Sequence, residues 1–216
     1  MVGLPASDPA TRVVRQPDRR LPPHPSWRLV CFLTLAALAV WLGARSSLAQ
    51  ATGVPAELQA ELLSKLSAYD RNFPARAGKE AIVLIVVKSG SAKSALSGAT
   101  IKAALSRLDR LGGVPHQEQV IQYESAAALA GACRSKRAAI VYVTPGFEDD
   151  IDAIKNALTG VDVLSVSAVP EHVPRGIVLG FEAVSGKSKI TINIAQARRQ
   201  RVDFKADVLK LMKVYR

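Results

Sequence analysis

Cysteine is almost absent from this 216-residue chain, which contains two, Cys31 and Cys133. Cys31 lies in an apolar segment that we expect to be removed on export, so one thiol remains and no internal disulfide can form. The fold must therefore rest on its hydrophobic core. We interpret Cys133, in a run of small helical residues, as a buried unreactive thiol, and a disulfide between two chains is the alternative.

Aromatic residues make up only 5% of the chain, and the usual catalytic signatures are also lacking. There is no Gly-x-Ser-x-Gly elbow, and Gly186-Lys187-Ser188 lacks the upstream spacing of a phosphate-binding loop. His116 and His172 have no ligand-spaced neighbours, so we interpret both as solvated loop residues and expect no metal site. We predict no catalytic residue and no cofactor, and therefore no enzymatic activity.

Acidic residues are outnumbered, and the formal charge of the chain is +11. The part after residue 49 keeps 23 of the 29 basic residues and 16 of the 18 acidic ones, a net charge of about +7. Its basic run, Arg198 to Arg201, has no interleaved aromatic residues on which bases would stack. We therefore expect solvent or a protein partner at this run, and no nucleic acid.

Residues 1–51 have the order of a secretory signal peptide. A basic, proline-rich front that we expect to be disordered precedes a fifteen-residue apolar run, 29–43, and small residues then follow. The predicted cleavage positions are after Ala49 or Ala51. A retained membrane anchor is the alternative, but fifteen helical residues reach only about 22 Å, less than the roughly 30 Å of a bilayer core. We expect no stable membrane span after cleavage.

Residues 52–216 alternate between apolar strands and amphipathic helices. The predicted strands are 81–88, 119–123, 138–143 and 161–166. Helices are predicted from Pro55 to the Phe73-Pro74 pair and over 91–111, 125–136 and 147–158. This alternation predicts right-handed crossovers and a largely parallel sheet covered on both faces. The fold class is a single three-layer α/β domain.

The last part of the chain, 176–216, changes the pattern. Two alternating runs, 177–183 and 190–194, flank the turn residues 185–188, which predicts an antiparallel β-hairpin. We place Phe181 in the core. The period then changes to that of a terminal helix, whose apolar stripe is Phe204, Val208, Leu211 and Tyr215.

This C-terminal pattern resembles the YfiR/HmsC-like family of small periplasmic proteins. The residues that carry the resemblance are Gly176, Gly180, Phe181, Ile192, Asn193, Ile194, Ala197, Arg198, Val208, Leu209 and Leu211. Where family members commonly have glycine and serine before the last helix, this chain has Arg201 and Lys205. The resemblance implies a periplasmic regulator that binds the outer part of an inner-membrane signalling protein, typically a diguanylate cyclase, and holds it inactive.

The predicted partner surface is the hairpin and the loop before it, 168–176, which two prolines make stiff. We predict that partner contacts come from exposed side chains there and on the basic run: Pro170, Val173, Pro174, Arg175 and Arg198. A homodimer is a further possible assembly.

A small-ligand-binding protein is the alternative function, because ligands favour the crevice outside the carboxyl ends of parallel strands. The residues that follow the first and third predicted strands would then form the site: Ser89, Gly90, Ser91, Pro145 and Gly146. The chain is too short for the second lobe with which solute-binding proteins usually close over a ligand.

Overall fold

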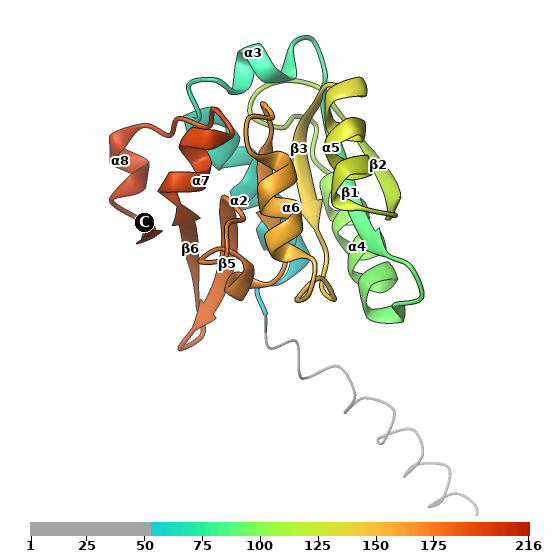
Figure 1. Ribbon diagram of the computed structural model, residues 1–216. Helices are drawn as coiled ribbons and strands as arrows, with labels where there is room; N and C mark the ends of the chain where they lie inside the picture. Colours follow the sequence, from blue (N-terminus) through green and yellow to red (C-terminus); the bar gives the residue numbers. More distant parts are fainter. Residues whose placement is uncertain (1–52) are drawn as a thin grey trace, which may run out of the picture. The chain divides into compact units, whose positions relative to one another are not determined.

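The computed structural model describes residues 53–216, and the predicted signal peptide with its cleavage positions lies outside the described residues. One seven-stranded sheet organises this part of the chain (Figure 1). The strands, in their order across the sheet, are β2 (His116–Tyr123), β1 (Ala81–Lys88), β3 (Ala138–Val143), β4 (Leu164–Ser167), β5 (Leu179–Val184), β6 (Lys187–Asn193) and β7 (Lys213–Tyr215).

The first five strands are parallel, and β5 and β6 form the antiparallel hairpin. All of β3 and most of β1 are buried, as their continuous apolar sequences predict for strands with both faces covered. The hairpin turn is tighter than predicted, because only Ser185 and Gly186 lie between the paired residues. Both have positive φ, 50° and 75°, which is typical of a two-residue hairpin turn. The predicted α/β sheet and hairpin are confirmed.

Four helices supply the outer layers. Helices α2 (Ala56–Tyr69) and α4 (Ala92–Leu105) cover one face of the sheet, and α5 (Ala126–Ser135) and α6 (Ile151–Leu158) cover the other. Shorter helical turns are α3 (Phe73–Ala77), η2 (Pro170–His172), α7 (Ile194–Arg199) and α8 (Ala206–Leu209). Within residues 53–216, no helix has the length and hydrophobicity needed to cross a bilayer.

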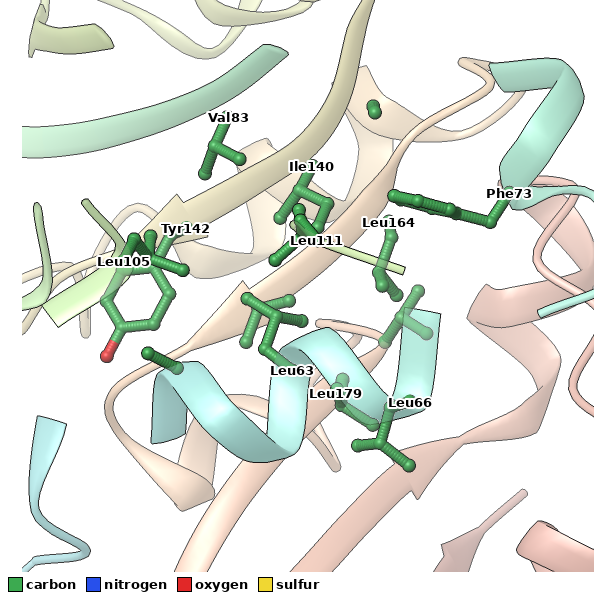
Figure 2. Close-up of a cluster of buried hydrophobic side chains, with 14 of the residues drawn as sticks. Leu63, Leu66, Phe73, Val83, Leu105, Leu111, Ile140, Tyr142, Leu164 and Leu179 are labelled. Carbon is green, nitrogen blue, oxygen red and sulfur yellow. The ribbon is translucent and has the colours of Figure 1, made fainter. Parts of the chain in front are cut away.

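Two linked hydrogen bonds in the core under α2 fix the residues just before this helix. Leu63 of α2 and Leu105 of α4 pack toward the sheet beside Tyr142 of β3 (Figure 2). The Tyr142 hydroxyl donates to Gln59 Oε1 at 2.6 Å, and Gln59 Nε2 donates to the carbonyl of Val54 at 2.7 Å. Buried polar groups need partners, and these two bonds satisfy the polar atoms of Tyr142 and Gln59. They also hold Val54, just before α2, against the carboxyl half of β3.

Two sequence-based interpretations of single residues have different outcomes. Cys133 is buried at 2% exposure, as predicted, and burial raises the pKa of its thiol to about 12. His116, predicted to be a solvated loop residue, instead lies in β2, and its side chain is only 4% exposed. Its Nδ1 contacts Glu118 at 2.5 Å and its Nε2 contacts the carbonyl of Leu108 at 2.9 Å. Burial is tolerated because both ring nitrogens have partners.

The C-terminal segment departs from the predicted helix. Helix α8 is a single turn, and residues Lys213–Tyr215 form β7, which pairs with β6 in parallel. Phe204 is buried where it forms an isolated β-bridge with Asp70. Leu211, a member of the predicted apolar stripe, is 74% exposed. The strand and bridge pairings therefore outweigh the helical periodicity of this segment.

Arg201 occupies a left-handed backbone conformation, with φ of 55°. A residue with a Cβ is strained in this conformation, which glycine adopts without steric cost. The conformation is held because the Arg201 carbonyl accepts hydrogen bonds from Asn72 Nδ2 at 2.8 Å and Arg76 Nη2 at 2.9 Å.

We predict that Arg201→Gly raises the free energy of unfolding by up to about 1 kcal/mol. Relief of left-handed strain, about 1–2 kcal/mol, outweighs the greater entropy of glycine in the unfolded chain, about 0.4–1 kcal/mol. Arg198→Gly in α7 is the control and should lower stability by about 1 kcal/mol. Urea unfolding followed by circular dichroism measures both. A loss of stability in Arg201→Gly would contradict this explanation.

Candidate functional site

The loops after β1 and β3 meet at the carboxyl edge of the sheet. Ser91 caps α4, because its Oγ accepts a hydrogen bond from the backbone N–H of Ser94 at 3.2 Å. Gly146 has φ of 100°, and a Cβ added to it would lie 3.6 Å from Ser91 Oγ. The structure thus brings the predicted ligand-binding residues of the two loops together.

A chain of hydroxyl groups makes this edge rigid. The backbone N–H of Lys88 donates to Ser94 Oγ at 2.7 Å, and Ser94 Oγ lies 2.6 Å from Thr144 Oγ1. Thr144 donates its one proton to the carbonyl of Val86 at 2.7 Å, so Ser94 donates to Thr144. Lys88 Nζ also donates to Asp150 Oδ2 at 2.8 Å. Both loops are therefore fixed relative to the sheet by satisfied hydrogen bonds.

We call residues 168–176, between β4 and β5, the crossover segment. Its η2 turn is closed by Ser167, whose Oγ accepts from the N–H of Val169 at 3.0 Å and contacts His172 Nδ1 at 2.8 Å. The prediction that His172 is a solvated loop residue is wrong: it is 1% exposed. Desolvation by burial lowers the pKa of His172, so the imidazole is neutral at pH 7.

Val173 is also buried, with 0% exposure, so the prediction that it offers an exposed partner contact is wrong. It fills the space left by Gly180 of β5, where an added Cβ would come within 2.6 Å of Val173 Cγ2. Proximity to the prolines suggested an exposed loop, but η2 turns this side chain inward.

Asn193, at the end of β6, holds the crossover segment from the other side. Its Nδ2 donates to the carbonyl of Val173 at 3.0 Å, and its backbone N–H donates to the carbonyl of Val178 at 2.8 Å. Its Oδ1 accepts from the N–H of Gln196 and so caps α7. Asn193 and Gly180 are both residues of the resemblance pattern. Their geometry shows that part of this pattern fixes the crossover segment.

The remaining predicted partner residues lie on two separate surfaces. Pro174 is exposed and Pro170 half-buried on the crossover segment. Arg175 donates to the carbonyl of Glu148 at 2.5 Å and to Asp152 Oδ2 at 2.6 Å, which ties the segment to the start of α6. Arg198 is exposed on α7, where it lines a different, smaller pocket. Within residues 53–216, no side-chain hydrogen bond or ion pair joins Arg198 to the crossover segment.

An open cleft of about 600 Å³ lies beside the crossover segment. It contains one residue from each predicted site, Pro145 and Pro170, and three charged residues that the sequence did not single out, Lys93, Glu171 and Glu182. Lys93 lies in the first turn of α4 and Glu171 in η2, whereas Glu182 lies within β5, so no shared sequence signal points to all three. The full lining is Gly53, Lys93, Pro145, Ala168, Val169, Pro170, Glu171, Phe181, Glu182 and Ala183. Among residues 53–216, no group of three or more His, Cys, Asp and Glu side chains could hold a metal ion.

These features describe an α/β domain with a rigid crossover segment and an open cleft near the carboxyl ends of its parallel strands. The chain belongs to the YfiR/HmsC-like family, whose sequence profile matches residues 56–213. No curated protein matches the chain in sequence.

Two solved structures share the fold. A conserved domain protein from Vibrio cholerae is 14% identical, with a TM-score of 0.54 over 75% of this chain and 60% of its own length. The ABC domain in complex with L-Trp from Streptococcus pneumoniae is 12% identical, with a TM-score of 0.53 over 75% of this chain and 62% of its own. This chain therefore spans less than two thirds of either structure, and the likeness concerns the fold alone.

We predict that Val173→Ala lowers the free energy of unfolding by about 2 kcal/mol, because it leaves a cavity beside Gly180. Pro174→Ala, at the exposed next position, is the matched control and should change stability by no more than about 0.5 kcal/mol. Chemical denaturation of the two variants measures the difference. Equal stabilities would contradict the packing of Val173 in the core.

Proposed function

We propose that this protein is a non-enzymatic periplasmic regulator. It binds the periplasmic part of an inner-membrane signalling protein, a diguanylate cyclase, and restrains that partner. The observation that carries the proposal is the family match over 56–213, which covers nearly all of the described domain. The predicted export signal supports the compartment, since residues 1–51 have a basic front, an apolar run and small residues at the cleavage positions.

The crossover segment supports a protein-binding role because it is ordered before any partner arrives. Three bonds fix it: His172 to Ser167, Asn193 to the Val173 carbonyl, and Arg175 to Asp152. A loop that is already ordered loses little conformational entropy on binding, so more of the contact energy appears as affinity. Its exposed residues, Glu171 and Pro174, form the proposed contact surface.

The proposed surface predicts that Pro174→Glu weakens binding to the partner's periplasmic domain by about thirtyfold or more. A central contact contributes about 2 kcal/mol, and the change adds a charge at an exposed position without disturbing the core. Titration calorimetry with the purified periplasmic domain of a membrane diguanylate cyclase from the same organism measures the affinity. Lys136→Glu makes the matched control, because Lys136 is exposed beyond α5, at the amino edge of the sheet.

Two outcomes would contradict different parts of this proposal. If Pro174→Glu binds at full affinity, the contact surface lies elsewhere, and Arg198→Glu on α7 tests the second predicted surface. If deletion of the gene leaves the cellular concentration of cyclic di-GMP unchanged, control of a diguanylate cyclase is wrong.

Small-ligand binding is a second candidate function, and the cleft of about 600 Å³ favours it. Its lining combines Lys93 with Glu171 and Glu182 and with apolar residues, including the buried Phe181. Ligand pockets commonly have a few polar groups among apolar walls, and this volume is within their usual range of about 300–1,000 Å³. A small molecule released when the purified protein is denatured, and detected by mass spectrometry, would favour this function.

A further inference from the structure

The positive charge of the chain after residue 49 belongs entirely to its last thirty residues. The stretch 187–216 contains nine basic and two acidic residues, which gives a formal charge of +7. The much longer stretch 50–186 contains fourteen basic and fourteen acidic residues and is therefore neutral. Solubility alone does not require such a concentration, because it depends on the net charge and not on the position of that charge.

The fold places this stretch at one end of the sheet. It contains β6, α7, α8 and β7, and β6 and β7 are the last two strands of the sheet order (Figure 1). We call residues 187–216 the basic end. Two of its nine basic side chains have acidic partners, since Lys210 pairs with Asp207 and Lys213 with Glu182. The other seven are exposed and form no ion pair among residues 53–216.

Apolar side chains are exposed among these charges. Leu211 is 74% exposed and Val214 42% exposed. A small pocket of about 110 Å³ lies beside β7, since its lining includes Ile192, the pairing partner of Val214 in β6. Most of this lining is apolar, and it includes the half-buried Leu209 of α8. A protein that lies on an anionic membrane combines these two features: apolar groups enter the interface, and cations attract the headgroups.

Other anionic partners fit the basic end less well. Nucleic acid would stack on exposed aromatic side chains, but Phe204 is buried and Tyr215 only half exposed. An acidic protein presents carboxylates at fixed positions, whereas the seven unpaired cations come from several elements without a common spacing. Anionic lipids move laterally, so a bilayer can bring headgroups to all of these cations at once.

We propose that the basic end binds the surface of an anionic phospholipid bilayer. Its exposed basic side chains contact the headgroups, and Leu211 enters the interfacial region. Binding at the membrane surface would keep the protein close to a partner anchored in the same membrane and so raise the effective concentration of the two. The proposal requires export but no particular signalling partner, so it can be tested without a cyclase.

The test is co-sedimentation of the purified exported protein with large unilamellar vesicles. The vesicles are of phosphatidylcholine alone or of phosphatidylcholine with about one third phosphatidylglycerol. At low salt, we expect the protein to bind the anionic vesicles and not the zwitterionic ones. Salt at about 1 M should weaken this binding, because it shortens the Debye length to about 3 Å.

Two double variants locate the binding surface. Arg198→Gln with Arg199→Gln removes two exposed cations from α7 and should lower the partition coefficient about 25-fold, about fivefold for each residue. Arg134→Gln with Lys136→Gln is the matched control. It removes two exposed cations at the end of α5, on the β2 side of the sheet, and should bind like the wild type. Both should keep the circular dichroism spectrum of the wild type.

Leu211→Ser tests the apolar part of the contact. It removes no charge, so it should lower the partition coefficient about tenfold without changing the dependence on salt. Binding of this variant at wild-type strength would contradict the insertion of Leu211.

Two further results would overturn the proposal as a whole. If the wild-type protein binds neither kind of vesicle, an acidic protein domain becomes the partner that fits the charge. If both double variants lose binding equally, the attraction follows the overall charge and not the basic end.

Discussion

A buried ion pair between Asp70 and Arg76 is the contact on which the C-terminal half of the domain depends. The side chains are 0% and 2% exposed, and Arg76 Nη1 lies 2.7 Å from Asp70 Oδ2. Arg76 also donates through Nε to Asp162 Oδ1 at 2.8 Å and through Nη2 to the Arg201 carbonyl. Asp70 Oδ1 accepts from the backbone N–H of Asp203 at 3.0 Å. The end of α2, α3, the loop before β4 and the C-terminal segment thus meet at one guanidinium and one carboxylate.

This network positions the structure that carries the proposed function. It holds residues 201–204 against α2 and α3, and Val202 and Phe204 complete the apolar core there. Helix α7 and strand β6 lead into that anchored segment, and Asn193 between them fixes the crossover segment. A charged pair far from the proposed contact surface therefore orders it indirectly. Burying such a pair adds little net stability, but loss of one partner leaves the other charge buried and uncompensated.

Local sequence patterns predicted the elements whose burial does not depend on particular residues far away in the sequence. The apolar runs of β1 and β3, the hairpin and the core position of Phe181 follow from composition and period, because these residues are buried by any sheet that forms. Val173 and His172 could not be placed in this way. Val173 is buried because Gly180, seven residues later, lacks a side chain, and His172 because Ser167 provides a partner. The prolines nearby indicated that Val173 is exposed, and the lack of ligand-spaced neighbours indicated a solvated His172.

The predicted terminal helix and the buried ion pair also depend on residues that are distant in sequence, so local patterns could not predict them. The spacing from Phe204 to Tyr215 fits a helix, but Phe204 pairs with Asp70 and Tyr215 with Asn193, both distant in sequence. Asp70 and Arg76 look like surface charges within an amphipathic segment. Only the meeting of four separate segments buries them. The cleft beside the crossover segment includes one residue from each predicted site, whereas its charged residues could not be identified from the sequence.

The role of the buried pair is tested most directly by the free energy of unfolding of Arg76→Ala, compared with that of Arg71→Ala. Arg71 pairs with Asp203 at 3.0 Å, but both side chains are more than half exposed. We expect Arg76→Ala to lose about 3–5 kcal/mol, because Asp70 is left buried without its cation, and Arg71→Ala to lose about 1 kcal/mol or less. The amide of Asp203 should also exchange faster with solvent in Arg76→Ala. Equal, small losses for the two variants would contradict the central role of the buried pair.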